Sequence, residues 1–252
     1  MLEGKVIIVT GGTKGIGEGC EEVMSRYGAQ VAFSARDAEA GARMEAQWRE
    51  AGRDVLYVQT DQCDPAQVQR MVDLTLERYG RLDGLVNNAG THISKTVFEH
   101  TEQDWDLVLQ TNLKGYFLFI KAALDHLVAS KGAIVNMSSM VGLVGQSRAT
   151  AYAATKGGIV AMTKSIALDL APYGVRVNVL CPGWIDTPLV EDWFQMQPDP
   201  EAARQYIYSV HPLGRIGTIY ECGEAAAFLL SERASFITGI ALEVDGAVTL
   251  GY

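Results

Sequence analysis

The chain has no long hydrophobic run and no excess of positive charge. None of its uncharged stretches approaches the ~20 residues that a membrane-spanning helix needs. It holds 21 lysines and arginines against 30 aspartates and glutamates, which gives a net charge of −9. Nucleic acids and anionic membranes both attract basic surfaces. We therefore expect no nucleic-acid partner and no membrane partner, although a local basic pocket for one phosphate is compatible with this charge.

Cysteine is also scarce, and its spacing excludes the usual cysteine sites. Cys20, Cys63, Cys181 and Cys222 lie far apart, with no C-x-x-C pair. This favours four free thiols in a reducing cytoplasm over disulfides. No histidine, cysteine and carboxylate cluster has ligand spacing, so we expect no metal. No basic segment followed by a long apolar stretch opens the chain, so we expect a cytoplasmic protein without a signal peptide.

Apolar, β-branched runs alternate with helical stretches along the chain. The expected strands cover residues 5–10, 30–34, 54–59, 82–86, 133–137, 176–180 and 241–244. The expected helices cover 15–27, 38–51, 65–79, 102–129, 152–171 and 220–230, and 183–212 has a looser pattern. This alternation predicts an α/β fold: a single doubly wound Rossmann-type domain over 1–252, whose seven-stranded parallel sheet carries helices on both faces. Ligands in such folds bind beyond the carboxyl ends of the strands.

Glycines gather between the first strand and the first helix, at Gly11, Gly12, Gly15 and Gly17. Glycine permits a sharp turn and lets backbone N–H groups approach a pyrophosphate, which the helix N-terminus also favours. An ordinary tight turn is the alternative for such a run taken alone. The spacing is T-G-x-x-x-G-x-G rather than the more familiar G-x-G-x-x-G.

Five further motifs follow this turn. They are Asn87-Asn88-Ala89-Gly90, Asn112, Ser138-Ser139, Tyr152-x-x-x-Lys156, and Pro182-Gly183 with Thr187. With the glycine turn, and over residues 4–250, they make the chain resemble the short-chain dehydrogenase/reductase family. The resemblance implies an NAD(P)-dependent oxidoreductase that moves hydride between a carbinol or carbonyl carbon and a nicotinamide ring.

Tyr152 and Lys156 are four residues apart on a predicted helix and therefore share one face. A general base needs a pKa near the working pH, whereas a free tyrosine titrates near ~10. A nearby ammonium favours the phenolate, so we expect Lys156 to lower the pKa of Tyr152. The resemblance adds Ser139 as the hydroxyl that holds the substrate oxygen and Asn112 as the holder of a water linked to Lys156. Ser138 is the alternative to Ser139, because successive strand residues point to opposite sides.

The residues after the second strand bear on the choice of cofactor. Family members that prefer NAD usually carry an aspartate at a position where this chain has Ala35. Arg36, Lys14 and Ser34 could instead bind a 2′-phosphate, so NADP(H) is favoured over NAD(H). In the alternative interpretation, Arg36 is a surface residue paired with Asp37.

The resemblance extends the cofactor-binding set over four loops, with Asp61 expected near the adenine. The further members are Gly11, Thr13, Gly15, Ile16, Gly17, Asp61, Gln62, Asn88, Ala89, Gly90, Tyr152, Lys156, Pro182, Gly183, Ile185 and Thr187.

A substrate pocket is expected from the loops after the fourth and fifth strands and from the region 187–212. The candidate residues, mostly apolar or aromatic, are His92, Met140, Gln146, Trp184 and Trp193. His92 and Gln146 could bind substrate hydroxyls or be structural. Residues 187–202 and the Leu250-Gly251-Tyr252 end resemble family members that act on L-fucose-type sugars and on 17-hydroxysteroids. We expect a small-molecule substrate: a sugar, polyol or other secondary alcohol first, a hydroxysteroid second, and a 3-oxoacyl thioester third.

Three rival functions remain. A dinucleotide sensor would not need Ser139, Tyr152 and Lys156, and a scaffold would need them still less. Sugar epimerases and dehydratases of the longer related kind use a different glycine spacing and a further C-terminal domain.

The resemblance also implies a homotetramer, through the two long helices and the C-terminal strand. Apolar residues are dense in 102–129, at Leu113, Tyr116, Phe117, Phe119 and Ile120. This density is compatible with a contact between subunits.

Overall fold

A computed structural model describes residues 1–250, in which seven strands form one parallel sheet of order β3-β2-β1-β4-β5-β6-β7. The strands are β1 (Val6–Thr10), β2 (Gln30–Ala35), β3 (Val55–Gln59), β4 (Gly84–Asn87), β5 (Ala133–Met137), β6 (Arg176–Pro182) and β7 (Ala241–Val244). The predicted α/β fold and its parallel sheet are confirmed, and no strand end differs from its predicted position by more than two residues.

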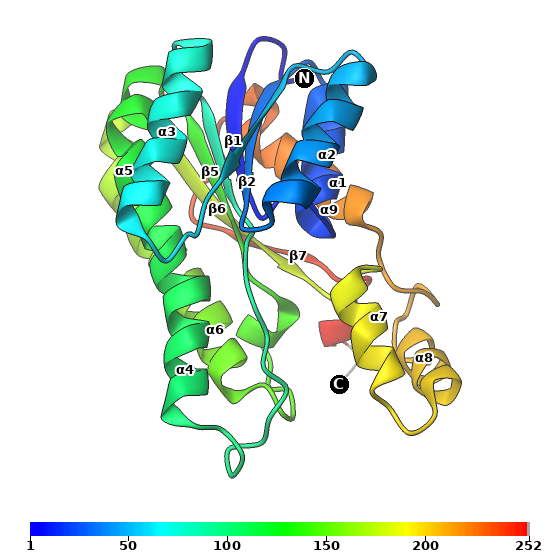
Figure 1. The fold of residues 1–252 in the computed structure, drawn as a ribbon. Helices are drawn as coiled ribbons and strands as arrows, with labels where there is room; N and C mark the ends of the chain where they lie inside the picture. Colours follow the sequence, from blue (N-terminus) through cyan, green and yellow to red (C-terminus); the bar gives the residue numbers. More distant parts are fainter. Residues whose placement is uncertain (251–252) are drawn as a thin grey trace.

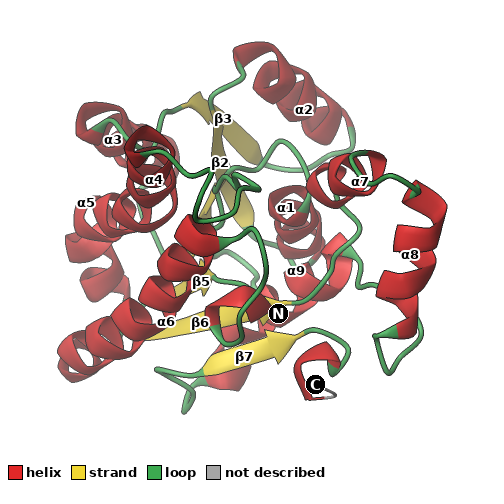
Figure 2. Ribbon diagram, turned by 90° about the horizontal axis from the view of Figure 1, so that it is seen from below, coloured by secondary structure: helices red, strands yellow, loops and turns green. Residues whose placement is uncertain are grey.

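Helices cover both faces of this sheet (Figures 1 and 2). They are α1 (Ile16–Arg26), α2 (Ala38–Glu50), α3 (Pro65–Tyr79), α4 (Glu102–Leu109), α5 (Gly115–Ser130), α6 (Thr150–Leu170), α7 (Pro188–Gln195), α8 (Pro200–Ser209) and α9 (Ile219–Leu230). Helices α1, α2 and α9 pack on one face, and α3, α5 and α6 pack on the other.

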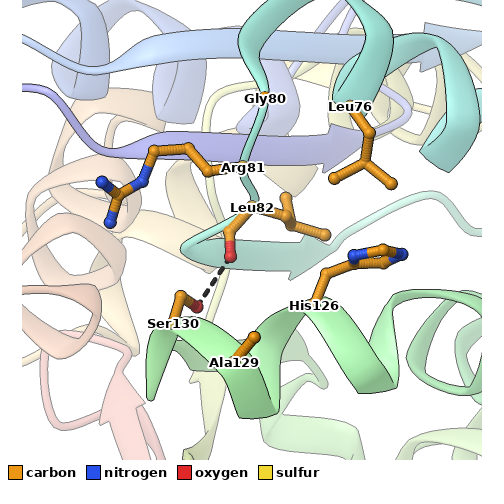
Figure 3. Close-up of a pocket in the computed structure, with 7 residues that line it drawn as sticks. All are labelled: Leu76, Gly80, Arg81, Leu82, His126, Ala129 and Ser130. Atoms are coloured by element: carbon orange, nitrogen blue, oxygen red, sulfur yellow. Dashed lines mark hydrogen bonds between the residues drawn. The ribbon is translucent and has the colours of Figure 1, made fainter.

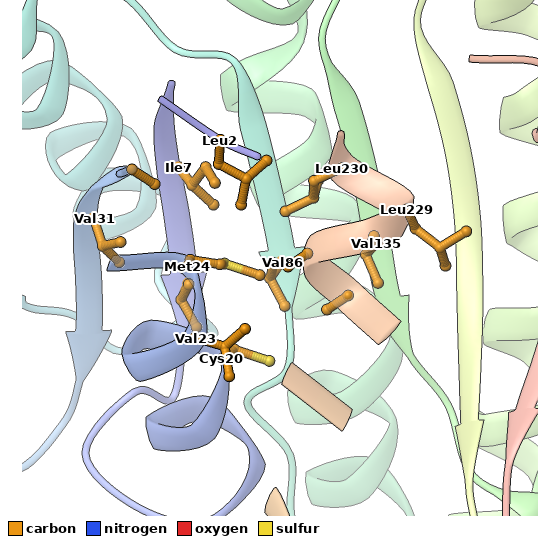
Figure 4. Close-up of a cluster of buried hydrophobic side chains, with 14 of the residues drawn as sticks. Leu2, Ile7, Cys20, Val23, Met24, Val31, Val86, Val135, Leu229 and Leu230 are labelled. Carbon is orange, nitrogen blue, oxygen red and sulfur yellow. The ribbon is translucent and has the colours of Figure 1, made fainter. Parts of the chain in front are cut away.

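The central strands are apolar along their length because both of their faces are covered. All five residues of β1 are buried, and so are all five of β5. Figure 4 shows one of the two resulting cores, where Cys20 and Met24 of α1 and Leu230 of α9 meet Val86 of β4. Burial on both faces is typical of parallel sheets.

The predicted helical region over 102–129 is confirmed, but it is not one regular α-helix. Helix α4 ends at Leu109, a π-helical turn covers Gln110–Lys114, and α5 begins at Gly115. The turn contains Asn112, whose side chain is fully buried and bonded to groups outside the helix. Single π-helical turns of this kind are frequent at functional sites.

The prediction of a looser region over 183–212 is wrong. Helices α7 and α8 lie there, at the lower right of Figure 1, and each begins at a proline. Thr187 and Asp199 cap them by accepting hydrogen bonds from the backbone N–H groups of Val190 and Ala202. A side-chain cap followed by proline in the first turn is a strong start for a helix. Pro188, Pro198 and Pro200 make the helical pattern of this segment difficult to recognise in the sequence.

Two further predictions concern the C-terminal residues and membrane-spanning helices. Gly251 and Tyr252, which contributed to the resemblance with sugar and steroid dehydrogenases, lie outside the described residues. Within residues 1–250, no helix is long and apolar enough to cross a membrane.

The core between α1 and the sheet should dominate stability. Met24 is 0% exposed, whereas Met196, at the end of α7, is 75% exposed. We predict that Met24→Ala lowers the free energy of unfolding by about 2–5 kcal/mol, because it removes buried methylenes and leaves a cavity. Met196→Ala, the same chemical change at the surface, should alter it by less than about 0.5 kcal/mol. Urea unfolding of both variants measures this, and equal effects would contradict the packing described here.

Candidate active site

The carboxyl ends of β1, β4, β5 and β6 bring the sequence motifs to one edge of the sheet. A cavity of about 130 Å³ opens there. Its lining comes from loops after these strands and from α6 and α7: Ile16, His92, Ser138, Ser139, Met140, Val141, Gln146, Tyr152, Pro182, Gly183, Trp184, Ile185, Thr187, Leu189, Val190 and Trp193. All five predicted substrate residues are in this set, together with Ser139 and Tyr152.

A second cavity, of about 220 Å³, lies elsewhere, between the C-terminal ends of α3 and α5. Figure 3 shows its lining, which includes Arg81, His126 and Ser130, and the hydrogen bond that Ser130 Oγ donates to the backbone oxygen of Leu82. None of the predicted site residues lies there, so the first cavity is the candidate active site.

The glycine turn is held tightly against the end of β4. Gly11 has a φ of +67°, and a Cβ atom there would lie 2.8 Å from Cα of Ala89. The Asn88 side chain donates to the backbone oxygens of Thr10 and Gly11 at 2.9 and 3.2 Å. A Cβ atom on Gly17, in the first turn of α1, would overlap the Gly11 carbonyl. Only glycine allows this close approach of turn, strand and helix.

The residues predicted to bind a 2′-phosphate lie at the end of β2 and in the glycine turn. Arg36 and Lys14 are exposed, and Ser34 is buried, with its backbone oxygen accepting the Gly12 N–H at 3.0 Å. Asp37 accepts a hydrogen bond from the backbone N–H of Ala40 and so caps α2. The carboxylate of Asp37 is thus engaged with the helix start rather than in an ion pair with Arg36 among the described residues.

Asp61 and Gln62 follow β3, and their side chains shape the loop around the turn. Asp61 Oδ1 accepts the backbone N–H of Cys63 at 2.9 Å. Gln62 donates to the backbone oxygens of Ala89 and Thr111, at 3.0 and 2.7 Å. The donating group of Gln62 therefore holds the β4 loop in place, which sequence patterns could not show.

Ser138 and Ser139 point to different places, as their alternation along the strand predicts. Ser138 Oγ donates to the backbone oxygen of Lys156 at 2.8 Å, which ties β5 to α6. The Ser139 side chain accepts the Val141 N–H at 3.2 Å and also forms a hydrogen bond with Tyr152. The geometry thus brings Ser139 and Tyr152 together in the cavity.

Lys156 is buried behind Tyr152. Its Nζ donates to the backbone oxygen of Met137 at 2.7 Å and lies 5.4 Å from the centre of the Tyr152 ring. The Tyr116 hydroxyl donates to the same Met137 oxygen at 3.1 Å. Burial lowers the pKa of Lys156 to about 7. The lysine is therefore only partly charged near neutral pH.

The prediction that Tyr152 has a lowered pKa is wrong for this arrangement. Burial raises the pKa of Tyr152 to about 12, and the hydrogen bond from Ser139 only partly opposes this shift. Lys156 does not compensate, because it has lost part of its own charge to burial and is bonded to Met137. The sequence argument considered the charge pair and omitted the desolvation of both members.

Asn112 is fixed by three hydrogen bonds next to α6. Its Oδ1 accepts the Thr91 N–H at 2.8 Å, and its Nδ2 donates to the Thr91 oxygen at 2.9 Å and to Thr155 Oγ1 at 3.2 Å. These bonds join the π-helical turn to the β4 loop and to the helix of Tyr152 and Lys156. The role of Thr91 and Thr155 was not evident from the sequence.

His92 stands beside Tyr152, with ring centres 4.7 Å apart. Its Nε2 is buried without a hydrogen-bond partner among the described residues, and burial lowers the pKa of the ring. A backbone hydrogen bond with Arg148 acts in the opposite direction on this pKa. Burial of the His92 ring beside Tyr152 therefore disfavours its protonated form.

Aromatic residues form the outer wall of the cavity. Trp184 packs against Trp193 with ring centres 4.7 Å apart, and Phe194 supports both. Sequence reasoning missed Val190, which is three residues from Thr187 and three from Trp193 on α7. A helical pattern for this segment would have placed the three on one face.

The loop after β6 forms another side of the cavity. The Gly183 N–H donates to the Val244 oxygen at 3.1 Å, next to Pro182 at the end of β6. Ile185 is buried and forms an isolated bridge with Gly217, and Thr187 caps α7. Both Ile185 and Thr187 line the cavity.

Comparison with known proteins identifies the class. Residues 11–249 match the family described as enoyl-(acyl carrier protein) reductase. The chain belongs to the short-chain dehydrogenase/reductase family, and it is an NAD(P)-dependent oxidoreductase that acts on CH–OH donors.

Three individual proteins show the range of its relatives. L-fucose dehydrogenase of Oryctolagus cuniculus is 43% identical, over 98% of this chain and 86% of the relative. The solved structure of actinorhodin polyketide ketoreductase with NADPH has a TM-score of 0.94 and 32% identity, covering 98% of this chain and 99% of the other. Aldohexose dehydrogenase of Thermoplasma acidophilum has a TM-score of 0.90 and 34% identity, covering 99% and 95%.

Burial of Lys156 should reduce the stability of the fold. A free lysine titrates near ~10.4, so between pH 7 and about 10 the unfolded chain binds more protons than the folded chain, and stability rises with pH. We predict that Lys156→Met stabilises the protein by up to about 4 kcal/mol at pH 7, an advantage that shrinks toward pH 10.

Thermal unfolding at pH 7, 8.5 and 10 measures this effect. Lys164→Met, an exposed position on the same helix, is the matched control and should show no such trend. A gain for Lys156→Met that does not change with pH would show that the lysine is not neutralised by burial.

Proposed function

We propose that this protein interconverts a hydroxyl group of a sugar or polyol and the corresponding carbonyl, with NADP(H) preferred over NAD(H) and Tyr152 as the acid/base. The observation that carries the proposal is the convergence of Ser139, Tyr152 and His92 in one cavity beside the glycine turn.

The site fits a nicotinamide dinucleotide. Gly11 and Gly17 leave space where any Cβ atom would clash, so the backbone of the turn can approach a ligand closely. The turn runs into the N-terminus of α1, which favours an anionic pyrophosphate. Residues after β3, β4 and β6 would complete the cradle, namely Asp61, Gln62, Asn88, Ala89, Gly90, Pro182, Gly183, Ile185 and Thr187. When bound, the nicotinamide supplies or accepts the hydride.

The protein's own residues would handle the proton and the oxygen. Tyr152 would give its phenolic proton to the substrate oxygen in reduction and take it back in oxidation. Ser139 would donate a hydrogen bond to that oxygen, which positions it against the tyrosine. Lys156, freed from the Met137 oxygen, would stabilise the phenolate through its charge. Asn112 would hold a water that connects Lys156 to solvent.

The preference for NADP(H) rests on three neighbours. Ala35 leaves the end of β2 without a carboxylate that would repel a 2′-phosphate. Arg36 is an exposed cation next to Ala35, and Lys14 is an exposed cation on the glycine turn, which is bonded to β2 through Gly12 and Ser34. An arginine can bind a phosphate through two parallel hydrogen bonds. The similarity to a ketoreductase with NADPH supports the same choice.

The sugar or polyol class rests on polar groups in an otherwise apolar cavity. His92 and Gln146 can bind hydroxyl groups next to the reacting carbon, and the apolar wall of Met140, Trp184 and Trp193 can cover a ring face. Similarity to an L-fucose dehydrogenase and to an aldohexose dehydrogenase supports this class.

A 3-oxoacyl thioester or a hydroxysteroid is the second candidate. The same aromatic wall would accept an extended or fused apolar skeleton, and the match to an acyl-carrier-protein reductase family favours the thioester. The acidic net charge of −9 opposes an acidic carrier protein as partner.

A homotetramer remains part of the proposal. Tyr116, Phe119 and Ile120 are buried within one chain and leave no apolar surplus, but Phe117 on α5 and Leu168 on α6 are 50% and 78% exposed. These two side chains lie on the helices that the family resemblance places between subunits.

The first experiment is a substrate panel followed at the absorbance of the reduced nicotinamide. Sugars, polyols, hydroxysteroids and 3-oxoacyl thioesters are each offered with NADP(H) and with NAD(H). We expect turnover of a sugar or polyol, and we expect Tyr152→Phe to lower it by about 10²- to 10⁴-fold with little change in cofactor affinity.

Tyr206→Phe, at an exposed position on α8, is the control for the same chemical change. Undiminished turnover in Tyr152→Phe would refute the acid/base role. Tight cofactor binding without turnover of any class would favour a dinucleotide sensor.

The cofactor preference has its own test. We predict that Arg36→Ala weakens NADPH binding by about 10- to 100-fold, because it removes charge-assisted hydrogen bonds to the 2′-phosphate, and leaves NADH binding nearly unchanged. Fluorescence titration of both cofactors measures this. Arg43→Ala, an exposed arginine on α2 near Glu39, is the control. An equal loss for NADPH and NADH would show that Arg36 does not recognise the phosphate.

A further inference from the structure

Glu21 is a carboxylate residue in an unusual place. It lies on α1 and is 1% exposed, although Glu18 and Glu22 on the same helix are only partly buried. Neither carboxyl oxygen of Glu21 has a hydrogen-bond partner among the described residues. A buried, unpaired carboxylate is costly, so such a group takes up a proton or serves a purpose that offsets the cost.

The carboxyl of Glu21 is seated against the glycine turn. A Cβ atom built on Gly12 would overlap Glu21 Oε1 and would lie 2.9 Å from Cβ of Phe33. Gly12 is also tied to β2 by its N–H bond to the Ser34 oxygen at 3.0 Å. The side chain of Glu21 thus fills the space behind Gly12, on the side of α1.

The rest of the turn also packs against neighbouring residues, but these residues are uncharged. Ala89 stands behind Gly11, and the Asn88 amide binds the oxygens of Thr10 and Gly11. Glu21 is the titratable member of this support. Position 12 requires a glycine, because any larger residue there would displace the carboxyl of Glu21.

No positive charge compensates Glu21 in the described structure. On α1 it faces Glu18, whose charge raises the pKa of Glu21 further above the value that burial gives it, and the Cys20 thiol adjoins it. On α9, the Cys222 thiol raises the pKa of Cys20, and no group of α9 is among the causes of the raised pKa of Glu21. From β2 it meets the apolar Phe33. Arg53 pairs with Glu22 instead, at 3.7 Å, and Lys14 on the turn points to solvent.

We propose that Glu21 is a positioning residue of the cofactor site, whose neutral, protonated carboxyl supports the Gly11–Gly12–Thr13 turn from behind in its dinucleotide-binding form. The inference rests on the proposed function, since it assumes that the turn binds the dinucleotide. Glu21 does not touch the cofactor in this proposal and acts only through the turn.

The first test measures stability against pH. An unfolded glutamate titrates near ~4.3, and the folded value is raised, so the folded chain keeps a proton that the unfolded chain loses. Stability is therefore lost as the pH rises above about 4.3 toward the folded pKa. Glu21→Gln keeps the shape and cannot ionise. Its folding equilibrium constant relative to the wild type should therefore rise with pH above about 4.3, by at most about tenfold for each pH unit, until the folded pKa of Glu21 is reached.

Glu22→Gln is the matched control for this arm. Glu22 is the next residue on the same helix, partly exposed and paired with Arg53. Its substitution should give a ratio that does not rise with pH. A flat ratio for Glu21→Gln as well would overturn the proposal, because the carboxyl would then be ionised in the folded protein.

The second test measures cofactor affinity in folded protein at pH 7, by fluorescence titration with NADPH and with NADH. Glu21→Ala leaves a gap behind Gly12, and we expect it to weaken binding of both by about tenfold. Glu21→Gln should restore the wild-type affinity, which a general loss of stability would not explain.

Three outcomes of the affinity test overturn the proposal. Wild-type affinity in Glu21→Ala would show that the turn needs no support from this side. A loss in Glu21→Gln equal to that in Glu21→Ala would show that a charged carboxylate is required. If the wild type binds neither dinucleotide, both this proposal and the proposed function fail, whereas the first two outcomes remove this proposal alone.

Discussion

The site depends on the junction between β1 and β4, where the order of strands in the sheet changes direction. The chain leaves β1 toward α1 on one face, whereas the segment after β4 leads to α4 and α5 on the other. The two connections diverge, and a crevice opens between them at the carboxyl ends of the strands. Thr10 and Asn88 join the two strand ends, because Thr10 Oγ1 accepts the backbone N–H of Asn88 and the Asn88 amide binds the Thr10 oxygen.

Buried polar groups surround this crevice, and three of them are held by backbone atoms of a neighbouring element. Asn112 binds the Thr91 backbone, Gln62 binds that of Ala89, and Lys156 binds that of Met137. Such networks define one arrangement because a shift of any element would leave a buried donor unpaired. Lys156 and Glu21 are the costly members, since burial opposes the charge of both. Their effects on stability have opposite dependence on pH, because one is a base and the other an acid.

The fold was predictable because its signal is repeated along the chain. Seven short strand-like runs, most of them apolar, alternate with helical stretches, which leaves little freedom for another topology. The two differences from the prediction arose where local chemistry competes with periodicity. The π-helical turn at Gln110–Lys114 has the same apolar pattern as the helices on either side of it. In α7 and α8, the proline at the start of each helix makes the helical periodicity difficult to recognise.

The site was predictable in its membership but less so in its energetics. Motif order placed Ser139, Tyr152 and His92 around one cavity, which needs only the direction of the strands. The pKa of Tyr152 could not be obtained in this way, because it depends on how completely the ring and Lys156 are removed from water. The burial of Glu21 is even less predictable from the sequence. In the sequence Glu21 is one of three glutamates in α1, and only the packing against Gly12 reveals its burial.

The electrostatics of the cavity also bear on the state in which the enzyme would react. With Lys156 bonded to the Met137 oxygen and the pKa of Tyr152 at about 12, the tyrosine holds its proton at neutral pH. That state suits proton donation to a carbonyl oxygen. In the mechanism proposed above, oxidation of an alcohol would require the phenolate of Tyr152 and therefore a charged Lys156 close to it. The Met137 oxygen has a second donor in Tyr116, so it stays hydrogen-bonded when Lys156 leaves it. A carbonyl acceptor shared by two donors thus lowers the cost of moving the lysine, and in the proposed mechanism this movement would separate a proton-donating site from a proton-accepting one.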